Sequence, residues 1–156
     1  MQTWTKFLPD YEITILDYDN LNRYLDKKII KQILCKETTL PKQVDCIRVA
    51  LLYFHAGIWL DADTIITRKF DEIARAGITM IGIPRTDAHL AFISANYPKR
   101  KFISLWLDEI YKRVKIYKIL SHSKLLQNVF RKRWKQCKNW DYFGNAIISR
   151  LITIFA

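Results

Sequence analysis

The sequence predicts an α/β fold in which helices cover a mixed, mostly parallel sheet. Two observations support this. The chain has 156 residues, of which 50% are hydrophobic, which suits one domain with a substantial core spanning residues 1–156. Segments with strand-like and helix-like patterns also alternate along it, and such alternation is typical of sheets whose strands run mainly in parallel. No run approaches the roughly 20 apolar residues of a membrane-spanning helix.

The first 56 residues contain one predicted strand and two predicted helices. The side chains of residues 11–16 alternate in polarity, and residues that break regular structure lie on both sides of them. This pattern predicts a strand. Residues 21–34 carry apolar side chains at helical spacing. Residues 39–56 do so more regularly, with Pro41 near the start and Gly57 placed to cap the end, so we expect a helix there.

Short extended segments follow the second helix. Residues 58–60 predict a buried strand that runs into the acidic turn at 61–63, and residues 64–67 continue as an extended piece. A further strand is predicted at 78–83, closed by a proline, and another extended segment at 90–94. In an open α/β sheet, ligands bind beyond the carboxyl ends of such strands.

The second half is basic and helical. Residues 102–117 and 121–134 predict helices with apolar stripes, and the surrounding part at about 99–138 contains many Lys and Arg residues but only Asp108 and Glu109 as acids, within a chain of net charge +11. A basic surface can attract nucleotide phosphates, nucleic acid or anionic lipid headgroups. Charge alone does not choose among them.

Cysteine usage and the N-terminus bear on the compartment. Cys35, Cys46 and Cys137 are odd in number and widely spaced, which favours reduced core thiols over a disulfide framework or a zinc site. The first residues lack the blocks of a secretory signal. We therefore expect a cytoplasmic protein.

Four polar residues predict a site for chemistry. Asp45 and Arg48 are three apart on a helix and share a face, while Asp61 and Asp63 follow a strand end with one residue between them. Two such carboxylates can bind a hard divalent cation that takes phosphate oxygens as further ligands. Arg48 could bind phosphate or orient a carboxylate, and Asp45 could accept hydrogen bonds from sugar hydroxyls.

An isolated Asp-x-Asp pair is more often a solvated turn, but its flanking sequence favours a functional role. The block from Asp45-Cys46-Ile47-Arg48 to Ala56-Gly57-Ile58-Trp59-Leu60-Asp61-Ala62-Asp63 resembles the signature of DXD-containing sugar transferases. Residues 41–45 and 58–65 are more closely similar to the bacterial capsular polysaccharide synthesis family. Weaker similarity involves Trp4 with residues 8–13, and residues 92–95 and 140–143.

The resemblance implies a GT-A nucleotide-diphospho-sugar transferase fold, here lacking its first strand, and retaining transfer from a UDP-sugar to a glycan or lipid-linked glycan in capsular or other surface polysaccharide synthesis. It also implies a Mn²⁺ or Mg²⁺ cofactor. Asp63 would ligate the metal, and Asp61 would bind ribose or sugar and assist the metal. Asp45 and Arg48 would hold the donor sugar. Trp59 would line the donor site or pack in the core.

Two departures from the family pattern leave alternatives open. Ala56 replaces the first of two glycines, and a positive φ there would cost about 1 kcal/mol or more. The chain also starts after the expected base-binding strand, and its apolar end at 151–156 resembles an element cut short, so a truncated inactive relative is one alternative.

The basic part at 99–138 has alternatives of its own. One is a nucleic-acid-binding module in which Trp134 stacks on bases, although a cleft of acids would repel phosphate and we expect no nucleic acid. We favour peripheral contact with the anionic inner face of the plasma membrane. A solvated basic face is the remaining explanation.

Overall fold

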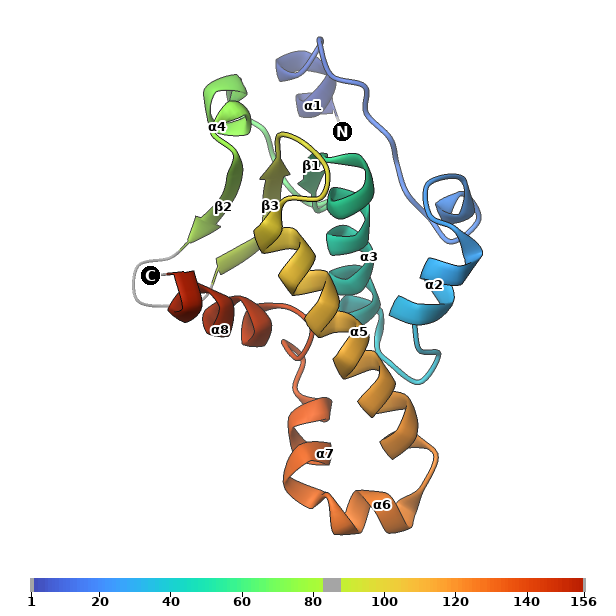
Figure 1. Ribbon diagram of the computed structural model, residues 1–156. Helices are drawn as coiled ribbons and strands as arrows, with labels where there is room; N and C mark the ends of the chain where they lie inside the picture. The colour runs from blue at the N-terminus through green and yellow to red at the C-terminus, as the bar shows by residue number, and fades with distance from the viewer. Residues whose placement is uncertain (1, 83–87, 156) are drawn as a thin grey trace.

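The computed structural model describes residues 2–82 and 88–155, which form helices packed around one small sheet (Figure 1). In chain order the elements are α1 (Gln2–Phe7), the 3₁₀-helix η1 (Leu21–Arg23), α2 (Lys27–Ile33), α3 (Leu40–His55), β1 (Gly57–Leu60), α4 (Asp71–Arg75), β2 (Ile78–Gly82), β3 (Ala88–Ala95), α5 (Lys101–Ser121), α6 (Lys124–Val129), α7 (Arg131–Lys138) and α8 (Asn145–Phe155). The molecule is therefore mixed α/β and mostly helical.

The sheet has the order β1-β3-β2, and both strand pairings in the described residues are antiparallel. The prediction of a mostly parallel sheet is wrong for this part of the chain. The connection between β2 and β3 explains one pairing, because residues 83–87 are too few for the crossover of a dozen or more residues that parallel neighbours need. Since β1 and β2 lie on either side of β3, they do not pair with each other.

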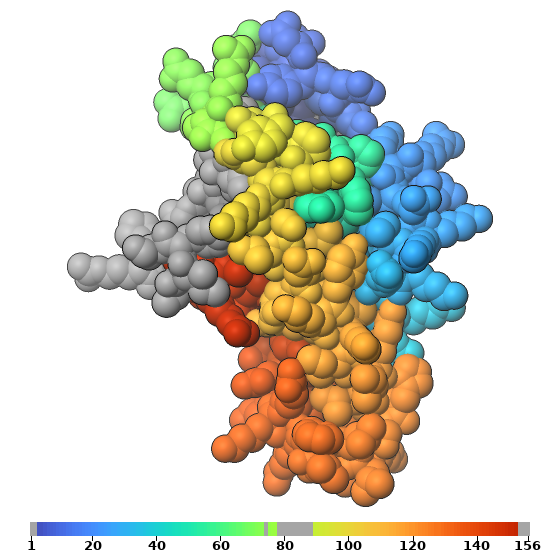
Figure 2. Space-filling model, viewed as in Figure 1, coloured from blue at the N-terminus to red at the C-terminus, as the bar shows by residue number. Residues whose placement is uncertain are grey.

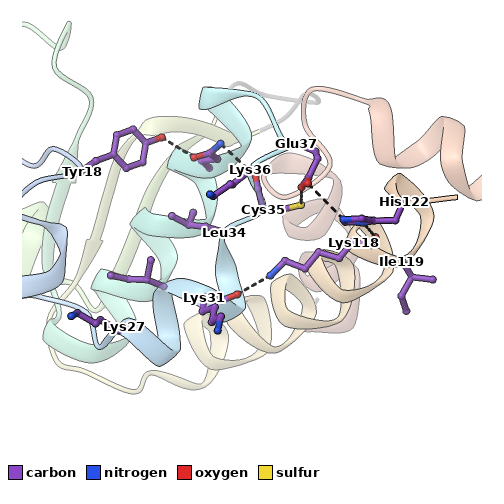
Figure 3. Close-up of a pocket in the computed structure, with 12 residues that line it drawn as sticks. Tyr18, Lys27, Lys31, Leu34, Cys35, Lys36, Glu37, Lys118, Ile119 and His122 are labelled. Atoms are coloured by element: carbon purple, nitrogen blue, oxygen red, sulfur yellow. Dashed lines mark hydrogen bonds and ion pairs between the residues drawn. The ribbon is translucent and has the colours of Figure 1, made fainter.

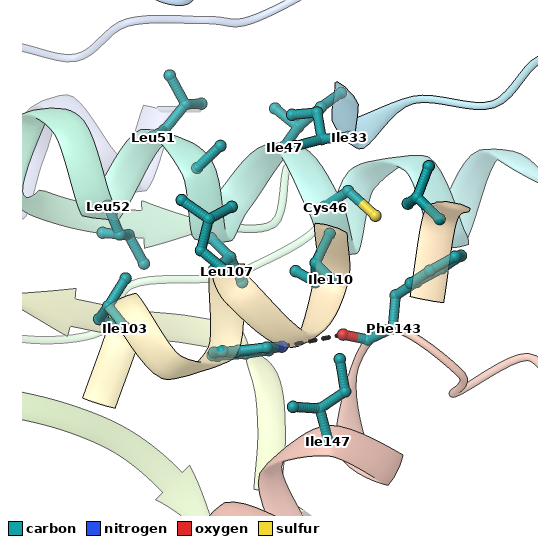
Figure 4. Close-up of a cluster of buried hydrophobic side chains, with 14 of the residues drawn as sticks. Ile33, Cys46, Ile47, Leu51, Leu52, Ile103, Leu107, Ile110, Phe143 and Ile147 are labelled. Atoms are coloured by element: carbon teal, nitrogen blue, oxygen red, sulfur yellow. Dashed lines mark hydrogen bonds between the residues drawn. The ribbon is translucent and has the colours of Figure 1, made fainter. Parts of the chain in front are cut away.

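Helices α3, α5 and α8 supply most of the core. Figure 4 shows side chains of α5, such as Leu107 and Ile110, facing Cys46 and other buried side chains of α3. The fully buried Trp106 of α5 donates a hydrogen bond from its indole to the carbonyl of Phe143, at 2.9 Å, just before α8. This core packs α3, which carries Asp45 and Arg48 of the predicted site, against α5.

The prediction of a strand at residues 11–16 is wrong. These residues have no regular secondary structure and belong to no strand of the sheet, and Trp4, which the resemblance placed by an early strand, lies in helix α1. The alternation has another cause. Tyr11 and Ile13 pack on a small second cluster with Trp4, while Leu16 packs on the main core, so side-chain burial replaces strand pairing.

Two predicted helices are each divided in the structure. Residues 21–34 contain η1 and α2, which are separated because Asp26 adopts an extended ψ of 140°. Residues 121–134 contain α6 and the start of α7, separated at Phe130, which has a non-helical ψ of 39°. In both regions the apolar periodicity is real, but the backbone turns between two shorter helices.

Other predicted elements are confirmed with small shifts of their ends. These include the helices at 39–56 and 102–117, the strand at 58–60 and the extended segment at 90–94, which correspond to α3, α5, β1 and β3. The predicted strand at 78–83 corresponds to β2, although its last residue and the proline after it lie outside the described residues. The three cysteines are buried, as expected of core thiols.

The basic helices form one end of the molecule. Figure 2 shows the segment from α5 through α7, in yellow to orange-red, as a continuous surface that runs down from the region of the sheet to the lower end. Among the described helices, none combines the length and the hydropathy that a bilayer crossing requires.

Candidate functional site

The acidic turn after β1 is fixed by backbone hydrogen bonds. The amide of Asp61 donates to the carbonyl of Ala91 in β3 at 3.0 Å, and the amide of Thr64 donates back to the carbonyl of Asp61 at 2.9 Å. The indole of Trp4 then donates to the carbonyl of Thr64 at 2.7 Å. These contacts hold Asp61 at the end of β1 and leave Asp63 exposed in the turn.

Arg48 is the centre of the site. Its side chain is buried, and its Nη2 lies 3.4 Å from Oδ1 of Asp61 and 3.6 Å from Oδ1 of Asp45. Its Nη1 donates to the carbonyl of Leu90 in β3 at 2.5 Å. One guanidinium therefore joins α3, the end of β1 and strand β3, which is the planar, multiple-donor geometry for which arginine is suited.

Trp59 contacts the same carboxylate. Its indole Nε1 donates to Oδ1 of Asp61 at 2.6 Å, and the guanidinium carbon of Arg48 lies 5.4 Å from the centre of its ring. Trp59 is also partly buried against the main core. Its ring thus packs in the core, and its polar edge holds Asp61, so the two predicted roles are not exclusive.

Asp45 lies deeper than Asp61. Burial raises its pKa to about 6, against the opposing effect of Arg48, while Asp61 and Asp141 add to the rise. Its Oδ2 would lie 2.8 Å from a Cβ placed on Gly144, so any larger residue beside the start of α8 would force this carboxyl to shift. Asp45 is thus held between Arg48 and Gly144.

A cleft of about 660 Å³ lies beside these residues. Arg48, Trp59 and Asp61 line it together with residues of the segment 11–16 and Trp4 of helix α1. The volume is in the range of sites that bind small molecules and cofactors. Neither Asp45 nor Asp63 lines this cleft, although Ala62 does, so Asp63 lies one residue from its edge.

The acidic residues fit one kind of metal site. In the part of the chain that the structure describes, no cluster of three or more His, Cys, Asp or Glu side chains could bind a metal by itself. Mg²⁺ and Mn²⁺, however, are often bound by one or two carboxylates together with waters and substrate phosphates. Asp61 and Asp63 are carboxylates of that kind, one residue apart in the chain, and Asp61 lines the cleft.

The structure therefore brings together Asp45, Arg48, Trp59 and Asp61 and leaves Asp63 exposed nearby. Sequence reasoning missed several parts of the site: the carbonyl of Leu90, the close approach of Gly144, the effect of Asp141 on Asp45, and the cleft wall formed by residues 11–16. The weak similarity at 140–143 was the only signal for the C-terminal part, because it lies directly before Gly144.

One of three comparisons with known proteins found a match. No curated protein and no solved structure matched the chain significantly. A family model described as "Capsular polysaccharide synthesis protein" matches residues 1–153, which include every residue of the site. The chain therefore belongs to the capsular polysaccharide synthesis protein family.

Proposed function

We propose that this protein is a metal-dependent, retaining glycosyltransferase of GT-A type chemistry, which transfers a sugar from a UDP-sugar to a glycan or lipid-linked glycan acceptor in capsular polysaccharide synthesis. The family supports the pathway. The observation that carries the proposal is the Arg48 contact with Asp61 at the wall of the 660 Å³ cleft. The proposal rests on these residues and not on the sheet, whose described pairings are antiparallel.

The residues of the cleft wall have distinct proposed roles. Asp61 faces the cleft and would accept hydrogen bonds from ribose or sugar hydroxyls, while Trp59 and Arg48 hold its carboxylate in place. Arg48 is only 5% exposed and is already committed to two carboxylates and a carbonyl, which favours an orienting role over direct phosphate binding. Asp45, behind Arg48, would act on the donor sugar through that guanidinium.

Asp61 and Asp63 would hold Mn²⁺ or Mg²⁺ together with the donor diphosphate. When bound, such an ion supplies a Lewis acid that stabilises charge on the leaving diphosphate. The turn hydrogen bonds from Thr64 and Trp4 would keep the two carboxylates near one another.

The proposed activity is tested by measuring Mn²⁺-dependent hydrolysis across a panel of UDP- and GDP-sugars. We expect turnover of a UDP-sugar by the wild type and its loss in Asp61→Asn and Asp63→Asn. Asp108→Asn is the matched control, because Asp108 is exposed on α5, away from the cleft, and should retain full turnover. An active Asp63→Asn protein would remove the metal assignment.

A second feature supports the proposed peripheral contact with an anionic membrane at the cytoplasmic face. Helix α6 has no buried residues in the structure, and Leu125, Val129 and Phe130 are 72%, 66% and 50% exposed. The cationic residues 131–133 follow directly. Exposed apolar residues beside cations are typical of segments that lie in a bilayer interface.

The ring of Trp134 packs 5.5 Å from that of Tyr117, which disfavours the stacking that a nucleic-acid module would need.

Liposome flotation tests the membrane contact. We expect binding to vesicles that contain anionic lipid and none to neutral vesicles. Replacing Leu125 and Val129 by serine should weaken binding without removing charge, which separates interfacial insertion from purely electrostatic attraction. No binding to anionic vesicles would support the solvated face.

A further inference from the structure

A second and larger cavity, of about 940 Å³, lies between α2, the loop after it and the C-terminal end of α5 (Figure 3). None of its lining residues lines the cleft beside Asp61. The hydrogen bond from Tyr18 to Oε1 of Gln43, at 2.8 Å, forms part of its wall. Gln43 of α3 lines this cavity, whereas Pro41 and Val44 of the same helix line the cleft. The start of α3 therefore separates the cavity from the cleft.

The floor of this cavity is apolar. Ile30 and Leu34 come from α2 and the residue after it, and Ile119, which is 52% exposed, comes from α5. The thiol of Cys35 also lines the cavity and donates to Oε2 of Glu37 at 2.6 Å. Burial and this hydrogen bond raise the pKa of Cys35 to about 11. At pH 7 its side chain is therefore a neutral thiol that lines the cavity and not a thiolate nucleophile.

Cations surround that floor. Lys27, Lys31, Lys36 and Lys118 all line the cavity, and the Nζ of Lys118 donates to the carbonyl of Lys31 at 2.7 Å, which ties α5 to α2. The one acid of the lining, Glu37, is engaged by Cys35 and lies 3.8 Å from the imidazole of His122. The lining therefore carries four lysines against one carboxylate, which gives the cavity a positive rim.

We infer that this cavity binds an amphiphile with a phosphate head and an alkyl chain. The apolar floor accommodates the chain, and the lysine rim attracts the head. Free phosphate would leave the apolar floor without a partner, and a neutral lipid would not use the lysines. Since the cavity is separated from the cleft by the start of α3, this binding does not depend on the proposed sugar transfer.

Dodecyl phosphate, used below its critical micelle concentration, is a suitable probe for calorimetry and for amide chemical shifts. We expect saturable binding, with inorganic phosphate and neutral dodecyl maltoside each at least about tenfold weaker. The amide shifts should centre on Leu34, Cys35 and Ile119 and leave Trp59 unchanged. Equal affinity for inorganic phosphate, or for the neutral detergent, would overturn the inference.

A lysine variant and a matched control locate the charge effect. Lys27, Lys31 and Lys36 have exposed side chains, so their joint replacement by alanine should leave folding intact and weaken binding at least about tenfold. The control replaces Lys112, Lys132 and Lys135, which are exposed outside the cavity. It should bind within about twofold of the wild type, and equal losses in the two triple variants would contradict a specific site.

Discussion

The Nη2 atom of Arg48 lies 3.4 Å from Oδ1 of Asp61, and this contact joins helix α3 to the acidic turn after β1. The same nitrogen lies 3.6 Å from Asp45. Arg48 and Asp45 are both buried, so their charges depend on each other more than those of a surface pair would. The stability of the fold and the geometry of the candidate site are therefore linked through one guanidinium.

Replacing Arg48 by methionine should make stability more dependent on pH. Asp45 would lose the cation that lowers its pKa, so its buried negative charge would be uncompensated at pH 7. Removing one partner of a buried pair costs about 3–5 kcal/mol. At pH 4.5 Asp45 is mostly protonated in the folded state, and the cost should be smaller. Urea denaturation at both pH values measures the difference.

Arg23→Met is the control for that experiment, because Arg23 is exposed and the substitution removes the same charge. Its unfolding free energy should stay within about 0.5 kcal/mol of the wild type at both pH values. If Arg48→Met lost the same stability at pH 4.5 as at pH 7, the charge of Asp45 would not be the reason for the loss.

Asp45→Asn should stabilise the protein at neutral pH while lowering donor turnover. The pKa of Asp45 is about 6 in the folded protein against 3.8 as the reference, so the folded state binds more protons between these values. The stabilisation that comes from protonated Asp45 is fully present below pH 3.8 and is lost as pH rises through about 6. The total loss of unfolding free energy is about 3 kcal/mol. Asparagine mimics the protonated form and should remove this loss.

Thermal or urea unfolding from pH 4 to pH 7.5 checks the sign. The variant and the wild type should be nearly equal in stability at pH 4. As pH rises, the variant should become increasingly more stable than the wild type. A variant that is less stable than the wild type at pH 7.5 would show that the attraction of Arg48 for the Asp45 carboxylate outweighs its burial.

Trp59→Phe separates the two roles of this side chain. Phenylalanine keeps the aromatic packing but loses the hydrogen bond to Asp61, and bonds to charged groups contribute about 1.5–3 kcal/mol. With Asp61 less constrained, we expect donor turnover to fall at least about tenfold. Trp134→Phe, in the basic helix α7, is the control and should keep its turnover. Unchanged turnover in Trp59→Phe would reduce Trp59 to a packing residue.

Local signals explain what could be predicted. Apolar spacing and Pro41 place helix α3, and the short apolar run before Asp61 places β1, because each pattern lies within one segment. The Asp45-to-Arg48 spacing follows from helix geometry alone. The half of the site that comes from residues 45–63 could therefore be read from the sequence.

Contacts between distant segments could not be predicted in this way. The carbonyl of Leu90 accepts from Arg48 across 42 positions, and Gly144 packs on Asp45 from the far end of the chain. Neither a backbone carbonyl nor a single glycine has a pattern that names its partner. The sheet direction was mispredicted for a related reason, since alternation of helices and strands does not reveal that β2 and β3 are joined by a short connection.

Ala56→Gly should stabilise the fold. Ala56 ends α3 with φ of 61° and ψ of −156°, a conformation that is costly for any residue with a Cβ, and Gly57 follows with φ of 93°. The strain anticipated for this departure from the family pattern is thus present. Glycine should relieve about 1–3 kcal/mol of backbone strain. Because glycine also increases the conformational entropy of the unfolded chain, the net gain in unfolding free energy should be about 1 kcal/mol, or roughly 2–4 °C in Tm.

Ala50→Gly provides a control of opposite sign. Ala50 is fully buried inside α3 with helical geometry, so glycine there should cost about 1 kcal/mol or more. Calorimetry of both variants thus tests the backbone at Ala56 and not a general effect of glycine. Because Ala56 directly precedes β1, a gain in stability accompanied by unchanged UDP-sugar turnover would show that the strain is not required to position Asp61. A loss in stability would mean that Ala56 does not adopt the positive φ.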